Sequence, residues 1–213
     1  MEASTHAAKK RGRTKSEVLG EFRCQEILVA ARRVFARKGF AEGIMDEIAR
    51  EAGIAKGTIY LYFRSKNEIY KALLDHDMKQ LQQSTLERMD SVTELKEKIQ
   101  AFLLVRLDNA EEKREFFRIM DSERANLHMT RKQYRDFLQE PVVRLALAID
   151  AAVASHQIRK VDGERTAWLI VDLARGAIQR RLLSQNPAPA TEDAAFLLDF
   201  IWHSLALSSS LAS

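Results

Sequence analysis

A short stretch of this chain, residues 44–66, restricts its fold more than any other part: IMDEIAREAGIAKGTIYLYFRSK. Its first half carries apolar residues at steps of three and four, a spacing that predicts a short helix with one apolar face: Ile44, Met45, Ile48, Ala49 and Ala52. Gly53 follows where glycine usually caps a helix, and a second apolar and aromatic run begins soon after it. Two short helices joined by a glycine turn form a helix-turn-helix, so we expect one here.

The second helix of this stretch displays side chains that suit DNA. Ile59 and Phe63 are four residues apart and can both face inward, which leaves an outward set: Lys56, Gly57, Thr58, Tyr60 and Tyr62. Among these, the lysine and the phenol hydroxyls can reach phosphates, the threonine can meet a base edge, and the glycine lets two backbones approach closely. Ser65 and Glu68 then form a capping box, so the next helix should begin with free amides that, together with Lys66, offer a phosphate site.

A wider pattern surrounds the helix-turn-helix: GF-x7-IA-x2-AGI-x2-GTIY-x-YF-x-SK-x2-I. It is read at Gly39, Phe40, Ile48, Ala49, Ala52 to Ile54, Gly57 to Tyr60, Tyr62, Phe63, Ser65, Lys66 and Ile69. Over residues 22–74 this pattern resembles the N-terminal DNA-binding domain of the TetR family of one-component repressors. The resemblance implies a homodimer that binds a double-stranded operator and responds to a small hydrophobic or amphipathic ligand.

The chain departs from the family pattern at the start of both short helices. Gly43 and Ile44 stand where the family commonly has a threonine pair, and Ala55 stands where it commonly has a serine. Two hydroxyls that would cap helices or touch phosphates are therefore missing, and losing a cap costs about 0.5–2 kcal/mol. We expect Ile44 and Ala55 still to lie at the DNA surface, with weaker anchoring unless another segment compensates.

The first 16 residues are polar and basic, a composition that predicts a disordered arm rather than part of a core. Arg11, Gly12 and Arg13 resemble the R-G-R centre of AT-hook peptides. Arginines favour the narrow minor groove of A·T-rich DNA. The arm is therefore either a solvated tail or a minor-groove arm, and in the second case Arg11 and Arg13 contact DNA.

Composition and charge exclude several classes of protein. The sequence has no run of about 18 apolar residues and no apolar signal segment near its start, so we expect a soluble, cytoplasmic protein with no membrane partner. One cysteine, Cys24, and five histidines without ligand spacing predict neither a disulfide nor a metal site, and we expect no cofactor. Residues 1–75 contain 15 Lys and Arg against 10 Asp and Glu, whereas residues 76–213 contain 19 against 20. The basic excess thus accompanies the helix-turn-helix, as a phosphate-binding surface requires.

The remaining sequence indicates helices throughout, and together with a helix over 21–38 it predicts an all-α fold of about nine helices. The expected helices after residue 90 are 93–110, 112–126, 130–157, 162–185 and 191–208. Pro141 should kink or divide the third of them, and Asp162 should cap the fourth. We expect a basic arm at 1–16, a helix-turn-helix domain at 17–65 and a C-terminal ligand-binding and dimerisation bundle at 66–213.

The last two expected helices are apolar on more than one side, so one face can pack inward and another outward. They resemble the family's four-helix dimer interface, and the stripe assigned to that interface is Ile170, Ala174, Ile178, Leu197, Ile201 and Leu205. Phe196 and Phe200 lie beside this stripe. The alternative is that these are the central helices of a monomer.

Large side chains gather in the region where the family binds its ligands: Phe102, Arg106, Phe116, Phe117, Met120, Tyr134, Phe137 and Trp168. Aromatic walls with a few polar groups suit a small organic ligand. The same residues are equally consistent with plain core packing. Arg106 is either a solvated residue or the counter-charge of an acidic ligand.

Three functions from different classes remain. The first is a dimeric transcriptional repressor that a ligand releases from its operator. The second is an architectural DNA-binding protein that works without a ligand, although the neutral C-terminal part argues against it. The third is an enzyme, but the sequence contains no G-x-S-x-G, no H-E-x-x-H and no phosphate-binding glycine loop, so we expect no catalytic residues.

Overall fold

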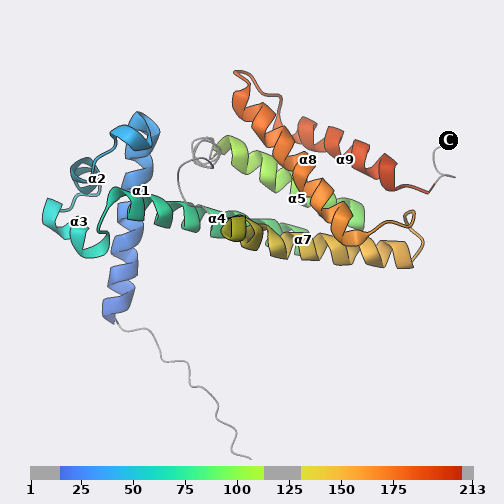
Figure 1. Ribbon diagram of the computed structural model, residues 1–213, viewed down its shortest axis with the longest axis horizontal. Helices are drawn as coiled ribbons and strands as arrows, with labels where there is room; N and C mark the ends of the chain where they lie inside the picture. Colours follow the sequence, from blue (N-terminus) through green and yellow to red (C-terminus); the bar gives the residue numbers. More distant parts are fainter. Residues whose placement is uncertain (1–14, 113–130, 208–213) are drawn as a thin grey trace, which may run out of the picture. The chain divides into compact units, whose positions relative to one another are not determined.

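The computed structural model describes residues 15–112 and 131–207, and every regular element in these residues is a helix (Figure 1). The helices are α1 (Lys15–Glu42), α2 (Met45–Glu51), α3 (Lys56–Tyr62), α4 (Lys66–Asp90), α5 (Leu95–Glu112), α7 (Arg131–Ala154), α8 (Gly163–Leu183) and α9 (Ala190–Leu205). The chain divides into two compact units, Met1–Leu74 and Asp75–Ser213. The all-α prediction is confirmed, whereas the functional boundary expected at residue 65 stays a prediction.

The N-terminal unit is built on α1, which starts six residues earlier than the expected helix over 21–38. Gly39 interrupts it with φ at 76° and ψ at 167°, a conformation that suits glycine because it has no Cβ. The expected apolar stripe is buried: Ile27, Leu28, Ala31, Val34 and Phe35. The helical spacing of these residues therefore forms one wall of the core.

The small core of this unit closes around Phe35. Ile48, Ile59 and Phe63 are also buried, as predicted, and the ring of Phe40 lies 5.5 Å from the ring of Phe35. Tyr70 of α4 completes the aromatic group, with its ring 4.5 Å from that of Phe40. The core thus joins residues from α1 to α4.

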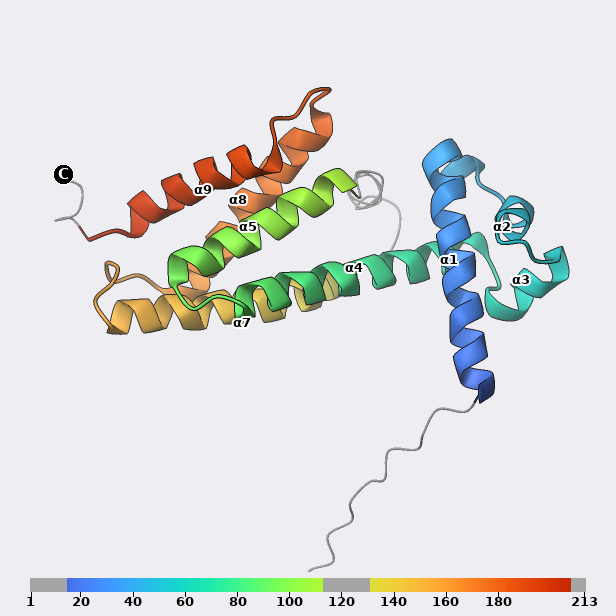
Figure 2. The same ribbon diagram turned by 180° about the vertical axis from the view of Figure 1, so that it is seen from behind.

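The C-terminal unit packs α5 against α7, α8 and α9, and α8 packs most extensively on α7. Both views show α5 alongside α9, while α8 crosses the bundle and reaches α7 (Figures 1 and 2). Gly163 opens α8 and is buried against α7, where an added Cβ would lie 2.8 Å from the backbone oxygen of Ala146. Only glycine allows this close approach of the two helices.

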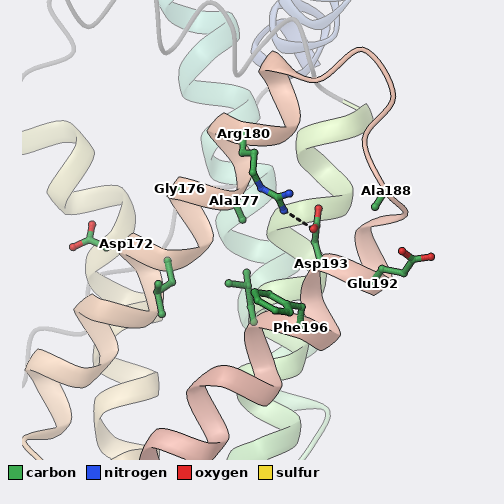
Figure 3. A pocket seen from close by; sticks show the side chains of 10 residues that line it. Asp172, Gly176, Ala177, Arg180, Ala188, Glu192, Asp193 and Phe196 are labelled. Atoms are coloured by element: carbon green, nitrogen blue, oxygen red, sulfur yellow. Dashed lines mark hydrogen bonds and ion pairs between the residues drawn. The ribbon is translucent and has the colours of Figure 1, made fainter.

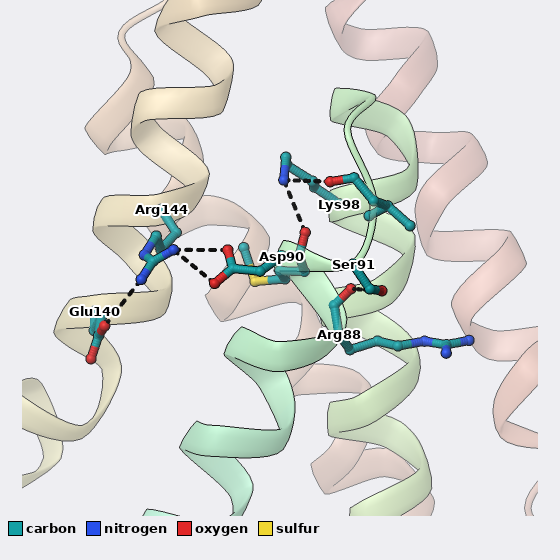
Figure 4. Close-up of polar contacts among 8 residues, drawn as sticks. Arg88, Asp90, Ser91, Lys98, Glu140 and Arg144 are labelled. Atoms are coloured by element: carbon teal, nitrogen blue, oxygen red, sulfur yellow. Dashed lines mark hydrogen bonds and ion pairs between the residues drawn. The ribbon is translucent and has the colours of Figure 1, made fainter.

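Polar contacts hold the end of α4 to its neighbours (Figure 4). Lys98 of α5 donates hydrogen bonds to the carbonyl oxygens of Met89 and Val92, at 2.9 and 2.7 Å. Arg144 of α7 donates to both carboxylate oxygens of Asp90, at 2.8 and 2.9 Å. The bond to Met89 satisfies a carbonyl that the end of α4 would otherwise leave unpaired, and the Arg144–Asp90 ion pair joins α4 to α7.

Pro141 lies inside α7, and the helix continues through it from Arg131 to Ala154. Of the two expected effects of Pro141, division of the helix is therefore wrong, and a kink stays a prediction. A proline cannot donate to the carbonyl four residues before it, but the surrounding helix still spans the position because its apolar side is buried: Phe137, Leu138, Val142, Leu145, Ile149 and Ala152. The predicted cap at Asp162 is confirmed, since its side chain accepts a hydrogen bond from the Arg165 amide at 2.8 Å.

The turn after α7 places His156 in the left-handed region, with φ at 57°. The His156 and Gln157 amides donate to the carbonyls of Val153 and Ala152, which is the hydrogen-bond pattern of a Schellman motif. Glycine is the usual residue at this position because a Cβ is strained there.

We therefore expect His156→Gly to raise the free energy of unfolding of the C-terminal unit by about 1 kcal/mol. Urea unfolding followed by tryptophan fluorescence measures this unit specifically, because both tryptophans of the chain, Trp168 and Trp202, belong to it. Gln157→Gly is the matched control, because Gln157 has no positive φ and should lose stability. A lower stability for His156→Gly would contradict the assignment of the turn.

In the part of the chain that the structure describes, every helix is too short or too polar to cross a membrane. In that same part, no group of three histidine, cysteine, aspartate or glutamate side chains is placed to hold a metal ion.

Candidate nucleic-acid interface

The predicted helix-turn-helix is formed by α2 and α3, with Gly53 at φ 68° in the turn between them. The buried Ile59 holds α3 to the core, and Phe63 packs inward just after the helix ends. Because a helix turns by about 100° per residue, Gly57 and Leu61 face away from this packed side. The helix therefore presents one face to solvent.

The predicted DNA contacts on α3 differ in exposure. Lys56, Gly57 and Tyr60 are exposed, whereas Thr58 and Tyr62 are half-buried. An added Cβ at Gly57 would meet nothing within 4 Å, so the protein itself does not require glycine there. The absence of a side chain at an open position leaves the backbone of α3 accessible to another molecule.

Lys56 does not stand alone on this surface. Its Nζ donates to Oδ2 of Asp46 in the first turn of α2, at a distance of 2.7 Å. The hydrogen bond that Lys56 donates to Asp46, followed by the negative charge of Asp46, raises the pKa of Lys56 above the ordinary value. Lys56 is largely exposed and Asp46 is partly exposed, so a phosphate can compete with Asp46 for the lysine.

Ion pairs join α2 to α1. Lys38 bonds Glu47 at 2.5 Å, and Arg37 bonds Glu51 at 2.9 Å. The hydrogen bond from Lys38 lowers the pKa of Glu47, and the hydrogen bond from Arg37 lowers that of Glu51. These pairs orient the helix that precedes the turn, and because they lie near solvent, salt screens them.

Lys66 has a role inside the protein that the sequence did not suggest. Its Nζ donates to the carbonyl oxygens of Phe40 and Ala41, at 2.7 and 2.9 Å, and lies 4.6 Å from the centre of the Phe40 ring. It thus satisfies the C-terminal carbonyls of α1. Its expected contact with a phosphate stays a prediction, and a Lys66→Ala variant would also lose this internal contact.

The predicted capping box at Ser65 and Glu68 forms in a modified way, because Glu68 reaches the residue before the N-cap. The Glu68 amide donates to Ser65 Oγ at 3.2 Å, and the Glu68 carboxylate accepts from the Arg64 amide at 2.7 Å.

The two missing capping hydroxyls have structural consequences. Ile44 and Ala55 are the N-cap residues of α2 and α3, and neither side chain makes a capping hydrogen bond. Ile44 and Ala55 are both exposed, as expected for positions at the surface. Gly43 is buried, and an added Cβ would lie 2.9 Å from the Phe35 ring, so this aromatic core leaves no room for a threonine.

Arg11 and Arg13 lie outside the described residues, so their expected role stays a prediction.

Sequence reasoning missed Leu61, whose side chain is 82% exposed. It lies four residues after Gly57, so the two share one face of α3. Its spacing of two residues from both Ile59 and Phe63 indicates an outward position, but an aliphatic side chain lacks the polar groups that usually mark a DNA contact.

The residues proposed for a ligand pocket separate into two groups. Phe102, Arg106 and Phe137 are buried together, with the Arg106 guanidinium 5.2 Å from the Phe102 ring centre and 4.8 Å from that of Phe137. The solvated alternative for Arg106 is therefore wrong. Trp168 instead lines a groove of about 350 Å³ between α7 and α8, with Glu164 and Arg135. Phe116, Phe117 and Met120, and the side chain of Tyr134, lie outside the described part of the structure.

The stripe expected at the dimer interface faces the interior of a single chain. All six residues are buried, with exposed fractions of 1–8%: Ile170, Ala174, Ile178, Leu197, Ile201 and Leu205. They pack within the bundle that α5, α7, α8 and α9 form, so the assignment of this stripe to the interface is corrected. The exposed apolar residues of α8 and α9 are instead Leu169, Leu183, Phe196 and Phe200.

A groove of about 620 Å³ lies on the exposed side of these helices (Figure 3). Gly176 and Arg180 of α8 line it, together with Glu192 and Phe196 of α9. Arg180 and the buried Arg181 each bond the Asp193 carboxylate at 2.6 Å, which ties the two helices together at one end of the groove. The outward face of α8 and α9 thus combines exposed aromatic rings with a hollow beside them.

Comparison with known proteins identifies relatives of this arrangement. Residues 27–73 match the sequence profile of the family described as "Bacterial regulatory proteins, tetR family". The chain is similar to the HTH-type transcriptional activator FasR of Mycolicibacterium smegmatis, with 23% identity over 190 residues, which cover 84% of this chain and 81% of FasR.

Two solved structures share the fold. One is the transcriptional regulator FadR from Bacillus subtilis in complex with stearoyl-CoA, with a TM-score of 0.70, 21% identity and coverage of 83% of this chain and 96% of that chain. The other is AibR in complex with isovaleryl coenzyme A and operator DNA, with a TM-score of 0.65, 20% identity and coverage of 84% and 97%.

Proposed function

This chain is a member of the TetR family of bacterial regulatory proteins, and on that premise we propose that it is a dimeric repressor, which a small ligand releases from a palindromic operator. The observation that carries the proposal is the exposed face of α3, where Gly57 leaves the backbone open and Lys56 and Tyr60 flank it. A two-fold dimer presents two such helices to successive major grooves on one face of the duplex. The proposed function requires no catalysis, and we propose the cytoplasm as its location.

We propose a thioester of coenzyme A, or an acid of similar amphipathic character, as the ligand. The FadR and AibR structures contain stearoyl-CoA and isovaleryl coenzyme A, respectively. In this chain the buried rings of Phe102 and Phe137 suit an acyl chain, and the Arg106 guanidinium between them supplies a positive charge. A ligand that binds better to one spacing of the two α3 helices shifts the dimer toward that spacing and so changes operator affinity.

Selection of bound duplexes from a random DNA library by the full-length protein, at stated salt concentration, tests this function. An enriched palindrome supports the dimeric operator-binding protein, and release of that duplex by an acyl-CoA supports the ligand. Tight, salt-sensitive binding without any enriched sequence would instead indicate the architectural DNA-binding protein. Transcription from the selected sequence measures the sign of regulation, which matters because the similar FasR is named as an activator.

Gly57→Ala separates DNA binding from folding. Because an added Cβ at Gly57 meets nothing within 4 Å, the variant should fold normally and gain up to about 1 kcal/mol from the higher helix propensity of alanine. The same methyl group holds the DNA away from the backbone of α3, so operator affinity should fall about tenfold or more.

The matched control for this variant is Gly20→Ala in α1, where an added Cβ also meets nothing within 4 Å. Gly20→Ala should retain operator affinity, which titration of the selected duplex measures. Equal operator affinities for the two variants would show that α3 does not contact the DNA.

A further inference from the structure

The side chain that stands at the centre of the outward face of α3 is aliphatic. Leu61 is 82% exposed, whereas Ile59 is fully buried and Phe63 is 6% exposed. At about 100° per residue, Leu61 lies on the side of the helix opposite these two residues and one turn beyond Gly57. Tyr60 lies next to it, and its side chain is 47% exposed.

Leucine can recognise little in a DNA groove. It has no hydrogen-bond donor or acceptor, so it cannot read the polar edges of the bases. In the major groove each base pair presents donors and acceptors, and the one apolar group among them is the C5-methyl of thymine. A leucine on the reading face therefore discriminates by contact with that methyl group.

We propose that Leu61 is a specificity-determining residue that contacts the C5-methyl group of a thymine in each half of the operator. The proposal rests on the proposed function, because it requires α3 to lie in the major groove. The open backbone at Gly57 supports it, since a helix that approaches the bases closely at Gly57 brings the side chain one turn later within reach of them. With 82% of its surface exposed in the single chain, the Leu61 side chain is free to make this contact.

Single-atom changes in the DNA test the contact. The probe is the duplex that the wild-type protein enriches from a random library, and each thymine is replaced in turn, in both half-sites, by deoxyuridine, which lacks only the methyl group. At one thymine position the replacement should weaken wild-type binding about fourfold per half-site, the factor expected for one buried methyl group. Leu61→Ala should bind the unmodified duplex more weakly and should not respond to the replacement at that position.

Two further measurements keep the test decisive. At the identified position, 5-methylcytosine should bind the wild-type protein more tightly than cytosine does, because it restores the methyl group. Leu19→Ala in α1 removes another exposed leucine and should keep the wild-type response to deoxyuridine. If the wild-type protein and Leu61→Ala respond alike at every thymine, Leu61 does not read the methyl group. If no duplex is enriched at all, the operator-binding function itself fails.

Discussion

Asp193→Asn is expected to lower the free energy of unfolding of the C-terminal unit by about 3 kcal/mol. Asp193 lies in the first turn of α9 and is 8% exposed. Its two carboxylate oxygens accept hydrogen bonds from Arg180 and Arg181 near the end of α8, both at 2.6 Å. Because Arg181 is itself buried, removing the Asp193 carboxylate takes a negative charge away from a guanidinium in the interior.

The Asp193 contribution depends on pH. Burial acts to raise the pKa of Asp193, but the hydrogen bonds and charges of Arg181 and Arg180 outweigh it and hold the pKa below the ordinary value of 3.8. A carboxyl whose pKa is lowered by folding stabilises the folded state above its unfolded pKa. That stabilisation is lost as the pH falls below about 4 and through the folded pKa. The wild-type protein should therefore lose this part of its stability in acid, whereas Asp193→Asn has already lost it at pH 7.

Urea unfolding followed by tryptophan fluorescence checks both expectations, at a fixed protein concentration because association also affects stability. The matched control is Asp172→Asn on α8, whose carboxylate bonds Arg175 at 2.8 Å but is 55% exposed. An exposed pair of this kind contributes at most about 1 kcal/mol, so the control should change little. Equal losses for the two variants would show that the buried ion pair does not stabilise the α8–α9 junction.

The helix-turn-helix could be predicted from sequence because local spacing determines it. Gly53 ends one helix, Ser65 and Glu68 begin another, and the inward residues of α3 are only four apart. Contacts between distant residues could not be read in this way. Lys66 bonds the carbonyl of Phe40, 26 residues away, and nothing in the local pattern links the two.

The helical periodicity of α8 and α9 revealed two apolar faces but not which of them is buried in the single chain. The more regular stripe, which includes Ile170 and Ile201, became the core. The less regular residues, such as Phe196, face solvent. Which face is buried depends on where α5 and α7 pack, and the sequences of α8 and α9 alone do not determine those positions. For the same reason the sequence predicts one pocket for Trp168, Phe102 and Arg106, whereas in the structure Trp168 lines a different groove from the other two.

The outward face of α8 and α9 is the surface that we propose for the dimer. Phe196 is 71% exposed beside the 620 Å³ groove, and Phe200, one turn later, is 60% exposed. A two-fold interface uses the same patch on both chains, so every residue in it occurs twice. Burying one phenylalanine contributes about 1.5–3 kcal/mol.

We therefore expect Phe196→Ala to weaken association by about 3–6 kcal/mol, or roughly two to four orders of magnitude in the dissociation constant of the dimer. Because Phe196 is exposed in the single chain, the variant should still fold, which substitution of the buried Ile201 would not allow. Analytical ultracentrifugation over a range of concentrations measures the dissociation constant of the dimer.

Phe22→Ala in the other unit is the control. It removes a phenylalanine of similar exposure, 63%, and should leave the dissociation constant of the dimer unchanged. Operator affinity should also fall for Phe196→Ala, because a monomer has one α3 and contacts only one half-site of the palindrome. A dimer of unchanged stability in this variant would show that the interface lies on another surface.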